Sequence, residues 1–485
     1  MSERLVKSAA ENFPQIWRYQ ASDRIPGAFR AISVKNLLLE PTPTISVYEW
    51  ADLNWSSPPA YAAISHTWTQ SEAVLKICKS QNRPLMIDTG ELNQPFNREI
   101  YWTGLVQAAH AARRLDCEYL WLDLLCIDQV SKPDAQGDND LEKNKQIQNM
   151  GKIYKCTRAV LVMVGGVGCV QGIDELSSWI DRAWTLQEVT LSKEVWAVVD
   201  WPYQDDFRLQ PLCLDDPNDD VGHEKYHFQF IQVKDTIKII RLVKLLTLEP
   251  VLIPNIPDFK MRCFDSNVHI SEHNLSGKTA ASSALYSMMK SETKEMTNCG
   301  AWRCMFQRTA TKEEDMIYSM MELIGVQLEV DYGRNLKDLY SEVAKNVAAK
   351  GLPAWLSIGG ASGDIIPRDP LSGLIPQLPT YRGNELPTYK IGNTFVPVTR
   401  LLEDSLNYVS HFDVRFPTSS VPHLVCCRTF EFPPPRHLAP DRRTGDLVQL
   451  NRLILFKTSA ELTGVSSLSL VHKGYAVITG RWEKE

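Results

Sequence analysis

The stretch Tyr61-Ala-Ala-Ile-Ser-His66 gives the first evidence for the fold. Its apolar residues run without interruption into a serine and a histidine, which is typical of a strand buried on both faces with polar groups at its carboxyl end. Tyr119 to Asp123, Ala159 to Val164 and Glu194 to Val199 have similar patterns. The sequence therefore predicts four short buried strands between residues 61 and 200.

Helical periodicity separates these strands. Apolar side chains recur at helical spacing from Tyr101 to Leu115, and the last turn carries two arginines, which suit the helix dipole. Further helices are predicted around Ile147 to Tyr154 and from Ser177 to Leu191. Strands that alternate with helices predict an α/β fold with a parallel sheet covered on both faces. Ligands of such sheets bind beyond the carboxyl ends of the strands.

Composition and hydrophobic pattern change along the chain, and the length of 485 residues favours more than one domain. We expect an N-terminal lead-in (1–60, with a strand near Ile45 to Tyr48), the α/β domain (61–200), a mostly helical region (201–350) and a β-rich C-terminal region (351–485). Helices are expected within the third region at Ile237 to Leu248, 313–326 and 336–350. Short alternating runs with proline and glycine dominate the fourth region.

Composition narrows the classes of function. Hydrophobic residues are 44% and the net charge is −6, so the chain can fill a core and has no excess of positive charge to attract a nucleic acid. No run of about 18 apolar residues predicts a membrane span, and the first residues lack the apolar segment of a secretory signal. The eleven cysteines form no CxxC pair and predict reduced thiols, so we expect a cytoplasmic protein.

Three segments match the pattern of one protein family, in the family's order. Tyr61 to Trp68 resembles Y-x-A-[LI]-S-[YH]-x-W, Leu120 to Gln129 resembles W-[IL]-D-x-x-C-I-[ND]-Q, and Arg182 to Glu188 resembles R-x-W-T-x-Q-E. The chain is thus similar to fungal HET (heterokaryon incompatibility) domain proteins over about residues 61–190. It departs from the pattern at Thr69, where a glycine is usual, and at His66, where tyrosine is commoner.

The HET domain in turn resembles TIR domains, which have a flavodoxin-like sheet. In catalytic TIR domains, a glutamate four residues after a tryptophan is needed to cleave NAD at the nicotinamide–ribose bond. Trp184 and Glu188 have this separation. The resemblance therefore implies an NAD glycohydrolase (NADase) with Glu188 as its catalytic residue, with NAD or a related nucleotide as substrate and no cofactor.

The resemblance also implies a biological role. HET proteins act in self/non-self recognition that leads to programmed cell death, so we expect homo-oligomers formed through the HET domain and a signalling protein as a further partner. Two alternatives remain open. The domain could be a non-catalytic interaction or scaffold module, or a different small-molecule enzyme that reuses the same cleft, because one fold hosts many chemistries.

The chemistry of the residues agrees with a cleft for a nucleotide. Trp184 and Glu188 share a helix face, where an indole could stack on a ring and a carboxylate could stabilise an oxocarbenium-like sugar. The plainer interpretation places Trp184 in the core and Glu188 in a cap or an ion pair.

The remaining candidates follow the strands or precede Glu188. Ser65, His66 and Trp68 could contact phosphate or ribose, or could simply form a turn. Asp123 could hold a ribose hydroxyl or order the neighbouring loops. Arg182 could pair with a pyrophosphate, or could be a surface arginine.

Three further patterns resemble functional motifs, but their surroundings do not favour a functional site. Cys126 beside His66 could form a nucleophilic pair, but an apolar run favours a buried, inert thiol. The glycines of 165–168 miss the spacing of a phosphate loop and predict a flexible turn. His269 to His273 fits H-x-x-E-H in a segment that is a poor helix, so we predict no metal site.

Overall fold

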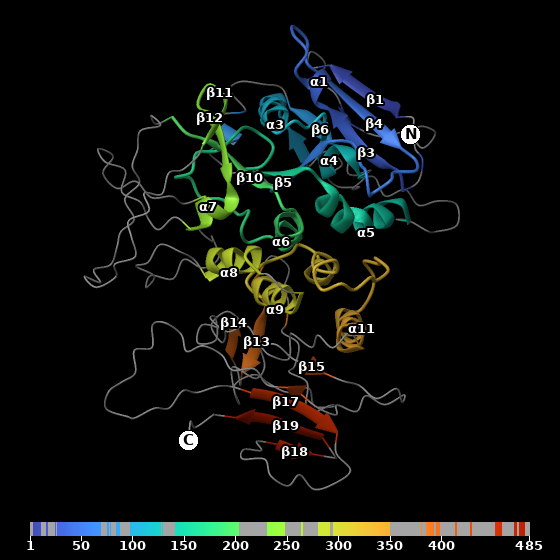
Figure 1. The fold of residues 1–485 in the computed structure, drawn as a ribbon, viewed down its shortest axis with the longest axis vertical. Coiled ribbons are helices and arrows are strands. Elements are labelled where there is room, and N and C mark those ends of the chain that lie inside the picture. Colours follow the sequence, from blue (N-terminus) through green and yellow to red (C-terminus); the bar gives the residue numbers. More distant parts are fainter. Residues whose placement is uncertain are drawn as a thin grey trace, which may run out of the picture. The chain divides into compact units, whose positions relative to one another are not determined.

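A computed structural model gives the structure of the chain (Figure 1). It describes residues 3–10, 16–17, 25, 27–68, 75–76, 78, 84–87, 98–127, 129, 141–202, 230–247, 263–264, 280–291, 294–349, 380, 385–391, 394–397, 413–414, 427–428, 452–457, 470–472 and 475–480. The chain divides into two compact units, the first with residues 1–286 and 329–331, and the second with 287–328 and 332–485.

A nine-stranded mixed sheet forms the centre of the first unit, with the strand order β1-β4-β3-β8-β5-β9-β10-β12-β11. The strands are β1 (Arg4–Ala10), β3 (Phe29–Ser33), β4 (Thr44–Trp50), β5 (Tyr61–His66), β8 (Tyr119–Trp121), β9 (Ala159–Met163), β10 (Val195–Asp200), β11 (Ile231–Lys234) and β12 (Ile237–Arg241). A small separate sheet has the order β2-β6-β7, with β2 (Ile16–Trp17), β6 (Leu85–Ile87) and β7 (Arg98–Ile100).

The four middle strands β8, β5, β9 and β10 are parallel, and the strands on either side of them are antiparallel. Along the chain they are the second, first, third and fourth parallel strands, so the direction of chain progression reverses beside β5. Every residue of β5 and β9 is buried. The prediction of an α/β fold with a buried parallel core is confirmed.

Helices cover both faces of this sheet. The principal helices are α1 (Val34–Leu37), α3 (Trp102–Arg114), α4 (Asp123–Cys126), α5 (Leu141–Cys156), α6 (Ala183–Thr190) and α7 (Leu242–Thr247). α3 packs against α1 and the strands, whereas α5 packs against α6, and Figure 1 shows α3 and the α5–α6 pair on opposite sides of the sheet. This arrangement follows from the reversal beside β5, because right-handed crossovers in opposite directions place their helices on opposite faces.

A close approach of two backbones fixes the turn after β9. A Cβ added at Gly104 of α3 would lie 2.7 Å from the carbonyl oxygen of Gly168, and Gly166 has a φ of 92°. The glycines predicted as a flexible turn therefore form a buried turn that lets α3 pack closely on it.

Three of the predicted helices differ from the structure. Of the helix expected over 313–326, only Asp315–Tyr318 is helical. The run from Ile237 was predicted as a helix to Leu248, but Ile237–Arg241 is strand β12, which pairs antiparallel with β10, and α7 begins at Leu242. The helix expected from Ser177 begins at Ala183 instead. At Ile237, pairing with a distant strand overrides the local periodicity.

Residues 1–60, which we expected to form a lead-in, contribute β1, β3 and β4 to the same sheet as residues 61–200. The strand expected near Ile45 is present as β4. Its partners on both sides are antiparallel strands.

The remaining elements continue toward the C-terminus. α8 (Ala280–Met289) spans the division between the units, and α9 (Lys294–Met305), α10 (Asp315–Tyr318) and α11 (Leu336–Ala349) follow. The described strands after them are β13 (Thr388–Ile391), β14 (Thr394–Pro397), β15 (Asp413–Val414), β16 (Cys427–Arg428), β17 (Arg452–Lys457), β18 (Leu470–His472) and β19 (Tyr475–Gly480). They form sheets β13-β14, β15-β16 and β17-β19-β18. Most of the region predicted to be β-rich lies outside the described residues.

In the part of the chain that the structure describes, no helix combines the length and the apolar character needed to cross a membrane.

Candidate functional site

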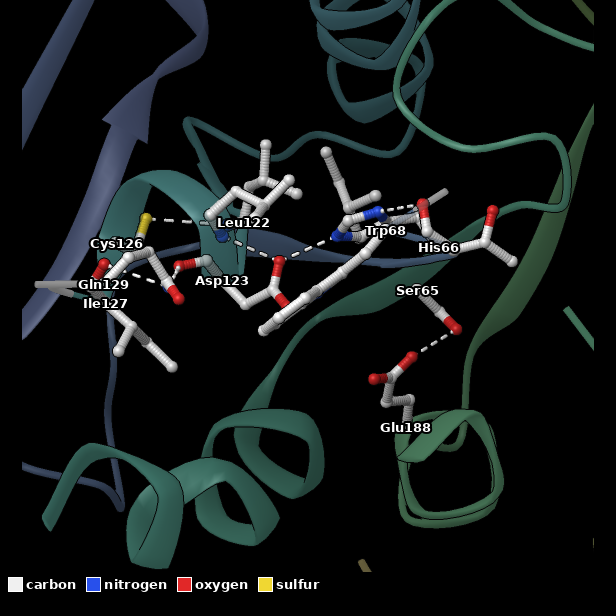
Figure 2. Close-up of polar contacts among 12 residues, drawn as sticks. Ser65, His66, Trp68, Leu122, Asp123, Cys126, Ile127, Gln129 and Glu188 are labelled. Carbon is white, nitrogen blue, oxygen red and sulfur yellow. Dashed lines mark hydrogen bonds and ion pairs between the residues drawn. The ribbon is translucent and has the colours of Figure 1, made fainter. Parts of the chain in front are cut away.

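Buried polar side chains gather at the carboxyl ends of β5 and β8 (Figure 2). Ser65 and His66 end β5, and Asp123 begins the short helix α4 just after β8. Parallel strands place their carboxyl ends at one edge of the sheet, and the reversal beside β5 sends the segments leaving β5 and β9 to opposite faces. Open α/β sheets bind ligands in the crevice at such a point.

Glu188 reaches this edge from α6 and contacts Ser65. The Ser65 hydroxyl donates a hydrogen bond of 2.6 Å to Oε2 of Glu188 (Figure 2), and the glutamate is only 6% exposed. Among the described residues, no other donor bonds this carboxylate. Burial raises the pKa of Glu188 to about 7, although the Ser65 bond and the charge of Arg182 act in the opposite direction.

The segment before α6 brings in a residue that the sequence patterns did not single out. Trp179 is fully buried, and its indole Nε1 donates to the Ser65 hydroxyl over 2.9 Å. The backbone turns at residues 177–182, and α6 then begins without a side-chain cap. The helical periodicity from Ser177 gives no sign of this turn, which directs the indole toward β5.

A second network surrounds Asp123. Nε2 of His66 lies 2.7 Å from Oδ1 of Asp123, which also accepts from the backbone N–H of Leu124, and Trp68 Nε1 donates to Oδ2 over 2.5 Å (Figure 2). Burial opposes ionisation of Asp123. The electrostatic interaction with His66 and the hydrogen bonds from His66 and Trp68 outweigh it and hold the pKa of Asp123 below its usual value. The oxygens of Asp123 thus face three hydrogen-bonding partners: two side chains from the end of β5 and the segment that follows it, and one backbone N–H of α4.

Both ring nitrogens of His66 face acceptors. Nδ1 lies 2.9 Å from the carbonyl oxygen of Thr67, and Nε2 faces the Asp123 carboxylate. These contacts fix the orientation of the His66 ring and join the end of β5 to α4.

Arg182 adds a positive charge to this edge of the sheet. Its Nη1 donates to the backbone carbonyl of His66 over 2.9 Å, and its guanidinium lies 5.7 Å from the ring centroid of Trp68. Arg98 lies 5.1 Å from the same ring. These contacts place Trp68 within a cationic surrounding and link the start of α6 to the end of β5.

Six of the seven candidate residues thus lie in two adjoining networks: Ser65 with Glu188, and His66 with Trp68, Asp123 and Arg182. Trp184 is partly buried at the start of α6 and makes no hydrogen bond or ring contact with these residues in the described part of the chain. Their assigned roles in catalysis and binding stay predictions.

The thiol of Cys126 is not placed as a nucleophile. Cys126 is 1% exposed, burial raises its pKa to about 12, and its sulfur accepts from the backbone N–H of Leu122. His66 pairs with Asp123 instead. Gln129 ties down the same turn by donating to the carbonyl oxygens of Asp123 and Ile127 (Figure 2).

Among the described residues, no group of three or more His, Cys, Asp or Glu side chains is placed to hold a metal ion. His269 and His273 lie outside the described residues, so the sequence prediction of no metal site there is not tested.

Comparison with known proteins gives one family. No curated protein and no solved structure matches the chain. A family model does match, and its range contains Ser65, His66, Trp68 and Asp123 but ends before Arg182 and Glu188. Residues 61–175 thus match the family described as Heterokaryon incompatibility protein (HET).

Proposed function

We propose that residues 61–200 form a TIR-like, flavodoxin-like domain that hydrolyses NAD at the nicotinamide–ribose bond, within heterokaryon-incompatibility-type cell-death signalling. The match of residues 61–175 to the HET family supports the biological role. The order of the four parallel strands, second-first-third-fourth, supports a flavodoxin-like arrangement.

One observation carries the enzymatic part of the proposal. Glu188 is a buried carboxylate at the carboxyl edge of β5, with a single hydrogen-bond donor among the described residues and a pKa raised to about 7. Titratable groups that are shifted toward neutral pH and held near a ligand-binding edge are typical of catalytic sites. A purely structural carboxylate would be expected to have more donors or a cationic partner.

The proposed chemistry needs one negative charge. The bond between ribose C1′ and the nicotinamide nitrogen breaks, both electrons go to the ring nitrogen, and nicotinamide leaves as a neutral molecule. The ribose is left with oxocarbenium character, which the ionised Glu188 stabilises, and water adds to C1′ with loss of a proton. The positive nicotinamide ring of bound NAD would itself favour the ionised form of Glu188.

Enclosure of Glu188 in the single chain bears on how the site would open. Because only 6% of this residue is exposed, a sugar reaches it only if neighbouring segments move. We propose that assembly of the domains into homo-oligomers, or contact with a signalling partner, produces this opening. The rate of nicotinamide release per protein molecule should therefore increase with protein concentration.

A second candidate function is a non-catalytic interaction module. The burial of Glu188 behind Ser65 favours it, because a carboxylate so enclosed can serve to hold α6 against β5. In that case the HET domain would recruit partners without consuming NAD.

Release of nicotinamide from NAD separates the two candidates. Purified protein is incubated with NAD over a range of protein concentrations, alongside Glu188→Gln and the matched control Glu118→Gln, an exposed glutamate next to the opposite end of β8. The proposal expects release by the wild type and by Glu118→Gln, and its loss in a folded Glu188→Gln. Equal release by all three removes Glu188 from the mechanism, and no release at any concentration supports the interaction module.

A further inference from the structure

We propose that Trp179 is a positioning residue that acts through Ser65, because its indole N–H polarises and orients the serine hydroxyl toward Oε2 of Glu188 and so leaves Oε1 for the substrate. This inference rests on the proposed function. Its structural basis is a chain of two hydrogen bonds, from Trp179 Nε1 to the Ser65 hydroxyl and from that hydroxyl to Glu188 Oε2.

The direction of this chain is fixed by chemistry. An indole N–H can only donate, so it occupies a lone pair of the Ser65 oxygen. The serine has one proton to donate, and that proton lies on the 2.6 Å bond to Glu188. The described residues offer this proton no other acceptor, so reversal of the bond to Glu188 would leave the serine proton without a partner, and Oε2 of Glu188 is the favoured acceptor in either charge state. Any proton that Glu188 takes up goes to Oε1, which is therefore the oxygen that titrates and is available to a sugar cation.

The indole is held rigidly in this direction. The backbone N–H of Trp179 donates to the Ser177 hydroxyl, and its backbone carbonyl oxygen accepts from the Thr185 hydroxyl. The Trp179 ring packs edge-on against Phe264, with the ring centroids 5.7 Å apart. Ser177 is bonded in turn to the carbonyl oxygen of Val164, just after β9. Contacts with the end of β9 and with α6 thus fix Trp179, and Trp179 in turn fixes the position of the Ser65 hydroxyl on β5.

Removal of the indole N–H would change the equilibrium between the protonated and ionised forms of Glu188. Without it, the Ser65 hydroxyl is less polarised and freer to rotate, so it donates more weakly to ionised Glu188 and stabilises the carboxylate less. The other charged and titratable groups around Glu188 stay in place: Arg182 at the start of α6, His66 on β5, Asp123 on α4 and Tyr154 on α5. We expect the midpoint of the pH profile to move upward by about one unit, since one neutral hydrogen bond is at stake.

The test compares Trp179→Phe with Trp196→Phe, both with NAD and without it. Trp196 lies on β10 in the same unit, and its indole N–H is buried with no partner in the described part of the chain, so its loss removes ring volume and an N–H without breaking a bond. The first readout is kcat/KM for nicotinamide release against pH. The second is titration of the Glu188 carboxyl, followed by NMR in protein labelled with ¹³C-glutamate and assigned by its loss in Glu188→Gln.

The expected result is an upward shift of both midpoints in Trp179→Phe and none in Trp196→Phe. At pH 6, kcat/KM of Trp179→Phe falls about tenfold, and it recovers at pH 9. A uniform loss of activity at every pH, with an unmoved Glu188 midpoint, shows a merely structural tryptophan and overturns the inference. If no variant or wild type releases nicotinamide, the proposed function fails, whereas the NMR shift still decides the role of Trp179.

Discussion

Two buried glutamates of the first unit have opposite surroundings. Glu49 on β4 accepts from the guanidinium groups of Arg30 and Arg4 and from the backbone N–H of Ile25. Its ion pair with Arg30 has both side chains fully buried. Glu188 on α6 is almost as enclosed, but its one hydrogen-bond donor in the described structure is the neutral hydroxyl of Ser65.

The difference teaches how to separate a structural carboxylate from a candidate catalytic one. Burial of a charge costs free energy, and at Glu49 two cations offset that cost. At Glu188 the Ser65 bond and the charge of Arg182 offset only part of the cost, and the rest appears as a pKa raised to about 7. A fold retains such a group at some loss of stability, which favours a functional reason for it.

The largest effect is expected where the ion pair is complete. Glu49→Gln should lower the free energy of unfolding by about 3–5 kcal/mol, because Arg30 would keep its charge inside the protein without a counterion. Denaturant unfolding at neutral pH measures this loss. A loss below about 1 kcal/mol would show that the pair is not the structural anchor that its geometry indicates.

A smaller effect on the free energy of unfolding, with a distinct pH dependence, is expected at Glu188. Its folded pKa is raised above the value of 4.5 for the unfolded chain, so the folded state holds the proton between pH 4.5 and about 7. Stability is therefore lost as pH rises through this window, by about 3 kcal/mol in total. Glu188→Gln lacks this loss.

Denaturant unfolding of the wild type and Glu188→Gln at several pH values measures the difference. The variant should gain stability relative to the wild type as pH rises from 4.5 to 7, and the difference should then stay constant. A difference that is the same at every pH would mean that Glu188 titrates normally.

The smallest effect is expected at Cys126. Cys126→Ala should cost roughly 1 kcal/mol of stability for the lost packing of a buried sulfur. Nicotinamide release should be unchanged, because burial keeps this thiol protonated with a pKa of about 12. A loss of nicotinamide release in a folded Cys126→Ala would show that the thiol takes part in the reaction.

The sequence was sufficient for the parallel core. The apolar runs at Tyr61 and Ala159 and the helical spacing after Tyr101 are local signals, and they appear as β5, β9 and α3. The antiparallel flanks were harder. The strand near Ile45 was predicted, but not its place in this sheet, and β12 pairs with β10, from which residues 201–236 separate it. A periodicity that fits a helix, as at Ile237, gave no warning of this pairing.

The candidate site shows the same limit. Motif residues at strand ends, such as Ser65 and Asp123, could be named from the sequence because strand ends meet at one edge of the sheet. The hydrogen bonds that define their roles could not, since Ser65 pairs with a glutamate 123 positions later. Trp179 was missed for this reason: its position depends on a turn that the helical pattern obscured.

Titration of the Glu188 carboxyl in the folded protein is the most direct test of the account. In protein labelled with ¹³C-glutamate, the carboxyl resonance that disappears in Glu188→Gln should titrate with a midpoint of about 7. A midpoint near the ordinary value of 4.5 would show that this carboxylate is solvated or compensated like any structural glutamate, and would contradict the account.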